Sequence, residues 1–290
     1  MLLLAEVAGM SRTKMNSGFS LKLTLAAIAG ISLFSITEAQ AQGLIWSLPD
    51  DGAWIRYEGD YEQVNSDPEA QDGEKTIKWV RHLIIKSVGK EMAQYKGKEV
   101  PCRWLELKVI TGKELDGTLN PGLVGSRIYK ILVPEARVVG DVKDSESIPV
   151  AYFPIIKGYR RVGKADAPPV EIKSKVFNIY PSICLLRHYK SFEAESGQPE
   201  DPGVGILNVS AVKYNGQLQL ESRQGRSLHE SSIWRSKDVP FGLAKWSVKI
   251  RTERKDNGDA RADFQESARI QCTMTAQEAG TDATSELAVP

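Results

Sequence analysis

The clearest alternation of hydrophobic and polar positions lies near the end of the chain, from Leu243 to Arg251. Because successive side chains of a strand point to opposite faces, a period of two predicts a half-buried antiparallel strand here. The buried face is expected to carry Trp246, Val248 and Ile250, and the exposed face Lys245, Ser247, Lys249 and Arg251.

The residues before this strand predict the other half of a hairpin. A first strand is expected to end at Trp234, followed by a shaped connection through Val239–Gly242. Pro240 fixes its own φ and Gly242 tolerates a positive φ. The chain can therefore turn sharply here and place Phe241 against the apolar face.

Similar patterns predict strands along most of the chain. Asn215-Gly216 is the strongest turn signal and predicts a two-residue hairpin in which Ala211 faces Leu220 and Lys213 faces Leu218. The run Asp256–Asp259 is expected to form the turn that leads into the last strand. The expected strands are Trp54–Gln63, Thr76–Val88, Cys102–Thr111, Arg127–Val133, two runs within Gly205–Arg223, the hairpin above, and Ala262–Thr275.

Together these elements predict a mainly β protein of the α+β class. Pro181 suits the first turn of a helix, so Ser182–Ser191 is the best helix candidate. A wide antiparallel sheet is expected to curve, and it must either close into a barrel or have its concave face covered. We therefore expect a strongly curved antiparallel sheet or half-barrel with one or two helices packed on or near the concave face.

Composition and charge add few constraints. The chain has 290 residues, of which 41% are hydrophobic and 26% charged, as in an ordinary globular protein with one large domain or two small ones. Residues 1–41 carry three Lys/Arg and two Asp/Glu, so 35 charges of each sign remain in the rest of the chain. This balance gives no electrostatic reason to expect a nucleic-acid partner.

The N-terminus has the three parts of a secretory signal peptide. The apolar run of about 14 residues is shorter than the ~20 that a membrane span needs, so we expect cleavage between Ala41 and Gln42 and no stable span afterwards. The true start is open between Met1, Met10 and Met15. We expect a signal peptide at 1–41, a single β-rich domain at 42–275 and a disordered tail at 276–290. The signal consists of Arg12, Lys14 and Lys22, the apolar run Leu23–Ile36, and Ala39-Gln40-Ala41.

The three cysteines, Cys102, Cys184 and Cys272, all lie in the part that we expect to be exported. An oxidising compartment permits one disulfide and leaves one thiol over, and the sequence does not determine the pairing. The alternative is that all three are small buried residues.

The sequence offers little that indicates catalysis or metal binding. It contains no nucleophile elbow, phosphate loop, dinucleotide fingerprint or paired-cysteine zinc spacing. His82, His188 and His229 lie far apart, and none has another ligand at metal-binding spacing. We therefore predict no catalytic, cofactor or metal site, and no cleft of convergent polar groups around these histidines.

Aromatic residues of the sheet are the remaining candidates for a binding site. A curved antiparallel sheet of this width can hold an apolar ligand such as an acyl chain. In the alternative interpretation the same side chains pack against covering helices and leave no cavity. The candidate lining residues are Trp79, Trp104, Trp234, Phe241, Trp246 and Phe264.

The order of these features resembles the periplasmic lipoprotein-carrier superfamily, whose members fold as an unclosed β-barrel stoppered by helices and bind acyl chains. The resemblance spans most of residues 50–275 as a pattern, and it transfers no catalytic or binding residue. Unlike that superfamily, this chain has no obvious long helix directly after its signal peptide. The resemblance rests on Trp54-Ile55-Arg56-Tyr57, on Cys102-Arg103-Trp104-Leu105-Glu106, and on Ile233-Trp234-Arg235-Ser236 followed by Val239-Pro240-Phe241-Gly242-Leu243.

The leading hypothesis is an exported, periplasmic or extracellular, non-catalytic binding protein of the cell envelope, whose partner is a lipid, a lipoprotein or an envelope protein. The alternative is a structural or interaction module with a fully packed core and no ligand cavity. A hydrolase ranks third.

Overall fold

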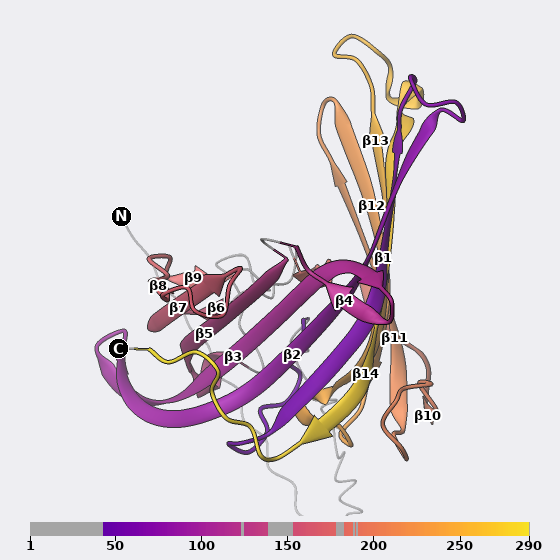
Figure 1. Cartoon of the computed structure of the whole chain (residues 1–290). Coiled ribbons are helices and arrows are strands. Elements are labelled where there is room, and N and C mark those ends of the chain that lie inside the picture. Colours follow the sequence, from indigo (N-terminus) through magenta and orange to yellow (C-terminus); the bar gives the residue numbers. More distant parts are fainter. Residues whose placement is uncertain are drawn as a thin grey trace, which may run out of the picture. The chain divides into compact units, whose positions relative to one another are not determined.

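One antiparallel sheet carries most of the residues that the structure describes (Figure 1). The structure is a computed structural model that describes residues 43–122, 125–138, 153–177, 183–187, 189 and 191–289. All of them belong to the unit that runs from Glu38 to Pro290. The signal peptide and its cleavage site lie outside the described residues. The expectation of a mainly β antiparallel fold is confirmed.

Most of the strands are long, and short 3-10 turns join some of them. The turns are η1 (Glu135–Arg137), η3 (Pro240–Gly242) and η4 (Arg261–Asp263). The strands are β1 (Trp54–Ser66), β2 (Glu74–Tyr95), β3 (Lys98–Leu115), β4 (Thr118–Asn120), β5 (Ser126–Pro134), β6 (Phe153–Pro154), β7 (Lys157–Val162), β8 (Val170–Glu171), β9 (Val176–Phe177), β10 (Ser191–Glu200), β11 (Ala211–Glu221), β12 (Gly225–Arg235), β13 (Leu243–Arg254) and β14 (Gln265–Gly280).

The sheet is open, with β10 at one edge and β8 at the other in the part of the chain that is described. The strand order is β10-β11-β12-β13-β14-β1-β2-β3-β5-β7-β8, with β4 beside β3 and with β6 and β9 as a separate pair. Most neighbours in this order are also neighbours in sequence. β5 pairs with β3 and with β7 across the short strands β4 and β6, and β1 pairs with β14 from the other end of the chain.

Alternation along the strands divides the sheet into a core face and an outer face. On β1, Ile55 and Tyr57 are fully buried on the core face, while Arg56 and Glu58 lie on the outer face. The alternation predicted from Leu243 onwards is confirmed in β13, where every second residue from Trp246 to Ile250 is buried. The register then continues the core face across the sheet, because Tyr57 pairs with Leu83 and Leu83 pairs with Val109.

The predicted connection between β12 and β13 is also confirmed. Phe241 and Gly242 both have positive φ, at 63° and 75°, so the chain turns sharply within η3. The ring of Phe241 is fully buried, as expected. Its carbonyl oxygen accepts a hydrogen bond of 2.8 Å from the backbone N–H of Trp46, which attaches the start of the described chain to this turn.

No α-helix covers the core face among the described residues, which corrects the predicted half-barrel with helices. Two segments that are neither strand nor α-helix take that place, and we call them the covering segments: Leu44–Trp46, and residues 183–187 with Tyr189. Leu185 has a φ of 60°, which a right-handed helix excludes. The carbonyl of Cys184 accepts a hydrogen bond of 3.1 Å from the Trp246 indole, so a sheet side chain takes an acceptor that a helix would use internally.

The Asn215-Gly216 pair does not form a turn, so the predicted register of Ala211 with Leu220 and of Lys213 with Leu218 is wrong. Both residues lie within β11, opposite Ser232 and Ser231 of β12. The physical reason is packing, because a Cβ at Gly216 would come within 2.6 Å of the Tyr189 ring. Glycine here allows the covering segment to approach the sheet.

The predicted turn at Asp256–Asp259 is confirmed, because it joins β13 to η4 and β14.

The C-terminal residues differ from the expected disordered tail. β14 continues to Gly280, and residues 282–287, which we call the C-terminal strap, cross the outer face of β1, β2, β3 and β5 (Figure 1, yellow). Glu106 of β3 is fully buried and accepts hydrogen bonds from the backbone N–H groups of Glu286 and Leu287 and from the hydroxyl of Ser285. A buried carboxylate with several donors fixes the strap to the sheet.

Candidate functional site

The six aromatic candidates do not line one cavity. The strand alternation places Trp79 and Trp246 on the core face, where the turn residue Phe241 is also buried. It places Trp104 and Trp234 on the outer face. Phe264 lies after η4, with the guanidinium carbon of Arg226 4.7 Å from its ring centroid. A shared ligand cavity built from all six residues is therefore excluded.

The two outer-face tryptophans take part in polar contacts. The indole N–H of Trp104 donates to Glu91 at 2.9 Å, and that of Trp234 donates to Glu200 at 2.6 Å. Lys130 lies over the ring of Trp104, with Nζ 5.5 Å from the centroid. Both tryptophans are therefore amphipathic surface residues that pack beside cations.

Two of the core-facing candidates fill the core. Trp246 is fully buried, and its ring meets Tyr57 edge-on with centroids 5.0 Å apart. Phe241 is also fully buried within the turn. Neither side chain leaves space for a ligand, which agrees with the interpretation of these residues as packing.

Trp79 lines a cavity of about 460 Å³ at one end of the core face, which we call the Trp79 pocket. Its volume lies within the usual range for small-molecule sites, and its exposed lining is mostly apolar. The lining residues come from β2, β3, β5 and the β4 connection: Trp79, Arg81, Thr111, Gly112, Lys113, Leu115, Asn120, Pro121, Gly122, Gly125 and Arg127.

Two glycines allow the β4 connection to form one wall of the Trp79 pocket. A Cβ at Gly112 would lie 2.0 Å from the carbonyl oxygen of Asn120, and a Cβ at Gly125 would lie 2.0 Å from that of Pro121. Real Cβ atoms do not approach so closely, so only glycine fits at either position. The backbone of this connection consequently packs directly against β3.

Arg81 is the most unusual residue of the Trp79 pocket, because it is a cation at an apolar position of β2. Its side chain is only 8% exposed. Nε donates to the hydroxyl of Thr111 at 3.1 Å, and Nη1 donates to the carbonyl oxygen of Ile183. The guanidinium lies 5.6 Å from the ring centroid of Tyr61, which stacks on Trp79 at 4.7 Å. Within the described chain, Arg81 forms no ion pair.

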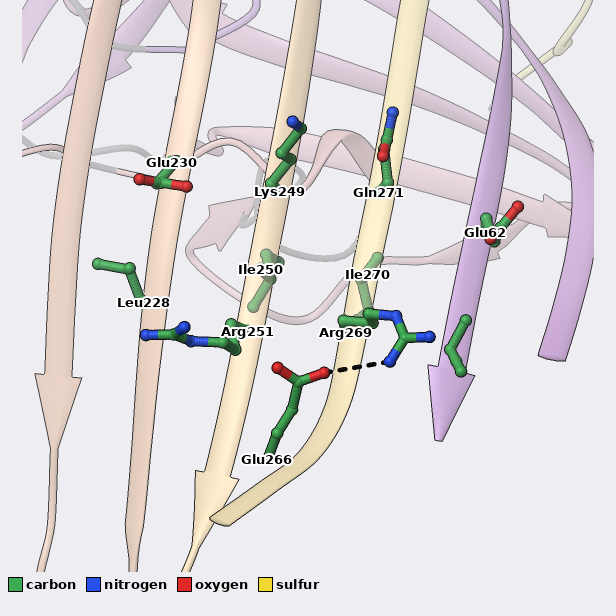
Figure 2. A pocket seen from close by; sticks show the side chains of 11 residues that line it. Glu62, Leu228, Glu230, Lys249, Ile250, Arg251, Glu266, Arg269, Ile270 and Gln271 are labelled. Carbon is green, nitrogen blue, oxygen red and sulfur yellow. Dashed lines mark hydrogen bonds and ion pairs between the residues drawn. The ribbon is translucent and has the colours of Figure 1, made fainter. Parts of the chain in front are cut away.

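A second groove of about 390 Å³ crosses β12, β13, β14 and β1 (Figure 2). Its polar side chains carry equal numbers of both charges, and several are already paired. Both terminal nitrogens of Arg269 contact Glu74 at 2.7 Å, and Nη1 also contacts Glu266 at 3.3 Å. Lys78 lies 2.6 Å from Glu62. The groove therefore has the character of a solvated sheet face.

His82 lies on β2 and His229 on β12, and His188 is outside the described residues. Nε2 of His82 is 3.5 Å from a carboxylate oxygen of Glu58 on the outer face. His229 lies on the core face of β12, where burial, aided by the charge of Arg187, lowers its pKa to about 4. No group of three possible metal ligands occurs among the described residues.

All three cysteines are buried and free, so the structure contains none of the disulfides that the sequence permits. Burial raises the pKa of the Cys184 and Cys272 thiols, because the thiolate loses its hydration. The thiols therefore act as small apolar groups of the core.

Comparison with known proteins adds no family. No protein-family model matches the sequence, and no curated protein is significantly similar to it. No helix in the described part of the chain is long and apolar enough to cross a membrane.

Sequence reasoning found Trp79 but missed Arg81, Thr111 and Lys113. A signal for Arg81 was present, since it lies on the same side of β2 as Trp79 and Leu83 and interrupts an otherwise apolar face. A charged residue in that position indicates either a polar contact within the core or a ligand. Thr111 and Lys113 carry no such signal, because they reach the pocket only through the pairing of β2 with β3.

Proposed function

We propose that the protein is an exported, non-catalytic binding protein of the cell envelope that holds a lipid or another apolar ligand in the Trp79 pocket. The observation that supports this best is the pocket itself, a mostly apolar cavity of about 460 Å³ on the core face of an open sheet. The ring of Trp79, which stacks on the buried Tyr61, offers the large apolar area that an acyl chain would cover.

Export is the second part of the proposal and rests on the sequence. The basic residues, the apolar run Leu23–Ile36 and the Ala39-Gln40-Ala41 site together have the order of a cleaved secretory signal. N-terminal sequencing of the protein recovered from the envelope or medium tests this, with Gln42 as the expected first residue. Recovery from the cytosol with residues 1–41 attached would contradict it.

Native mass spectrometry and a titration with a fluorescent fatty acid test binding. The purified exported protein should carry a removable lipid-sized mass and, once delipidated, bind the probe. Trp79→Ala should weaken binding by about tenfold or more, because it removes most of a large apolar contact. Trp234→Ala is the matched control, since Trp234 lies on the outer face, and it should bind the probe like the unchanged protein.

A structural or interaction module is the second candidate. It is favoured by the covering segments, in which Leu44, Ile45 and Cys184 are almost completely buried against the core face. For this function neither a bound lipid nor any probe binding is expected, whereas co-purification of an envelope protein is. The binding experiment thus separates the two candidates.

A further inference from the structure

We propose that the Trp79 pocket selects an anionic amphiphile, whose acid group, a carboxylate or phosphate, is held by Arg81 and by the indole N–H of Trp79. This inference rests on the proposed function and specifies its ligand. The groups that carry it are a buried cation and a buried donor, for which the described residues supply no carboxylate and no acceptor respectively, and an apolar wall beside both.

The guanidinium of Arg81 carries a charge that the described residues do not neutralise. Removing a guanidinium from water is costly unless an anion or a full set of acceptors replaces its hydration. Here the described residues supply one hydroxyl, from Thr111, and one carbonyl, from Ile183, and both acceptors are neutral. Five N–H donors are available on a guanidinium, so capacity for a carboxylate or phosphate remains.

Trp79 lies two residues before Arg81 on the same face of β2. Its indole nitrogen is buried and has no acceptor within the described chain. Trp104 and Trp234, by contrast, donate to Glu91 and Glu200. Because buried indole N–H groups usually have partners, the unpaired donor of Trp79 indicates an acceptor that a ligand supplies.

The pocket as a whole combines positive charge with apolar surface. Its described lining residues include no aspartate or glutamate, and Lys113 of β3 and Arg127 of β5 add positive charge to that of Arg81. Leu115, Pro121 and the Trp79 ring supply apolar surface in the same cavity. The groove in Figure 2 differs, because its three cations are balanced by three glutamates. Positive charge next to apolar surface matches an acid with a long hydrocarbon chain.

Three ligands of related chemistry test the inference on the delipidated exported protein: hexadecanoate, hexadecanol and inorganic phosphate, each measured by displacement of the fluorescent probe. Hexadecanoate should bind at least about tenfold more tightly than hexadecanol, because charge-assisted hydrogen bonds are available only to the acid. Phosphate alone should displace the probe only at concentrations far above those of hexadecanoate.

Two substitutions assign the acid preference to its donors. Trp79→Phe keeps the aromatic ring and removes the N–H, and Arg81→Gln removes the charge. Each should reduce the preference for acid over alcohol several-fold while changing hexadecanol binding by less than about twofold, since apolar contacts remain. Trp234→Phe is the matched control on the outer face and should leave the preference unchanged. Trp79→Phe also keeps the test valid if Arg81→Gln fails to fold.

The possible failures are distinguishable. Equal affinity for hexadecanoate and hexadecanol would overturn the inference and leave the proposed apolar binding intact. If phosphate bound as tightly as hexadecanoate, the proposal of an amphiphilic ligand would be overturned, and the pocket would be a small-anion site. If neither long-chain ligand binds, the proposed function fails, and this inference fails with it.

Discussion

His229 places an ionisable group on the core face of β12. It is 3% exposed, its Nε2 is 3.1 Å from the hydroxyl of Ser227, and its Nδ1 has no partner within the described chain. Loss of hydration on burial is the larger cause of its lowered pKa, and the positive charge of Arg187 is the second. The folded protein therefore favours the neutral imidazole.

This histidine should make stability depend on pH. Its pKa is about 4 when folded, against an ordinary 6.5, so between these values the unfolded chain binds a proton that the folded protein does not. The stability linked to the neutral imidazole is therefore fully present above about pH 6.5. As the pH falls toward 4, the free energy of unfolding decreases by up to about 3 kcal/mol. Urea unfolding across this range, compared with His229→Gln, isolates the effect; identical slopes would contradict it.

Gly216 gives a second prediction for a single residue. Gly216→Ala would place a Cβ 2.6 Å from the ring of the buried Tyr189, so the covering segment must move. We expect a loss of roughly 1–3 kcal/mol in the free energy of unfolding. Gly258→Ala is the control, because its Cβ would meet nothing within 4 Å, and it should change stability by less than about 0.5 kcal/mol. Equal effects would exclude close packing as the reason for glycine.

Gly216 also shows why residue-scale sequence reasoning failed at this point. Asn-Gly between two apolar runs usually predicts a hairpin turn, because both residues tolerate positive φ. Here the ring of Tyr189 packs so closely against Gly216 that a Cβ would not fit, and no local sequence pattern indicates that contact. The core-facing Trp246, by contrast, was placed correctly from alternation alone.

Among the elements, the C-terminal strap has the most specific attachment. The buried carboxylate of Glu106 accepts hydrogen bonds at 3.0 Å from the backbone N–H groups of Glu286 and Leu287 and at 2.8 Å from the hydroxyl of Ser285. Leu287 is fully buried beside it. Composition alone, with small and acidic residues, predicted disorder because this attachment depends on one residue of a distant strand.

Glu106→Gln should release the strap. The amide replaces one accepting oxygen with an NH₂ group, which cannot accept from the backbone N–H groups of the strap, so we expect a loss of about 2–4 kcal/mol and faster hydrogen exchange at residues 285–287. Glu286→Gln is the matched control, since its partly exposed carboxylate pairs with Lys86 and Lys108 at 2.6 Å, and it should cost less than about 1 kcal/mol. Unchanged exchange in Glu106→Gln would show that the strap is held by other contacts.

The covering segment that contains Ile183 and Cys184 is an element whose place the sequence indicated but whose conformation it did not. Pro181 and the apolar residues after it favoured a helix from Ser182. In the structure, Leu185 adopts a left-handed conformation and the carbonyls of Ile183 and Cys184 bond to Arg81 and Trp246. Tertiary hydrogen bonds therefore replaced the helical ones, and this competition has no signature in local propensity.

On the scale of the whole molecule, folding depends on the pairing of β1 with β14. Their register joins Trp54 to Gly280 and Asn65 to Ala268, so the first and last long strands are neighbours. β14 also pairs with β13 and thus links the two halves of the sheet. Contacts of such long sequence separation slow folding and make it cooperative.

Deletion of residues 265–290 should consequently abolish folding of the whole sheet. β1 and β13 would both lose a partner along an apolar face, and we expect no cooperative unfolding transition by circular dichroism. Deletion of 282–290 is the control, because it removes the strap and leaves β14 in place; this variant should unfold cooperatively at lower stability. Independent folding of β1–β3 in the larger deletion would contradict the prediction.

The sequence by itself determined most of the long strands, their buried and exposed sides and the turn at Val239–Gly242, because period-two burial and the backbone preferences of proline and glycine act locally. It did not determine which strands are neighbours across the chain, what covers the core face, or that Arg81 and Trp79 share a pocket. Those features depend on contacts between residues far apart in sequence. Such contacts exist only after the register of β1, β2, β3 and β14 has been set.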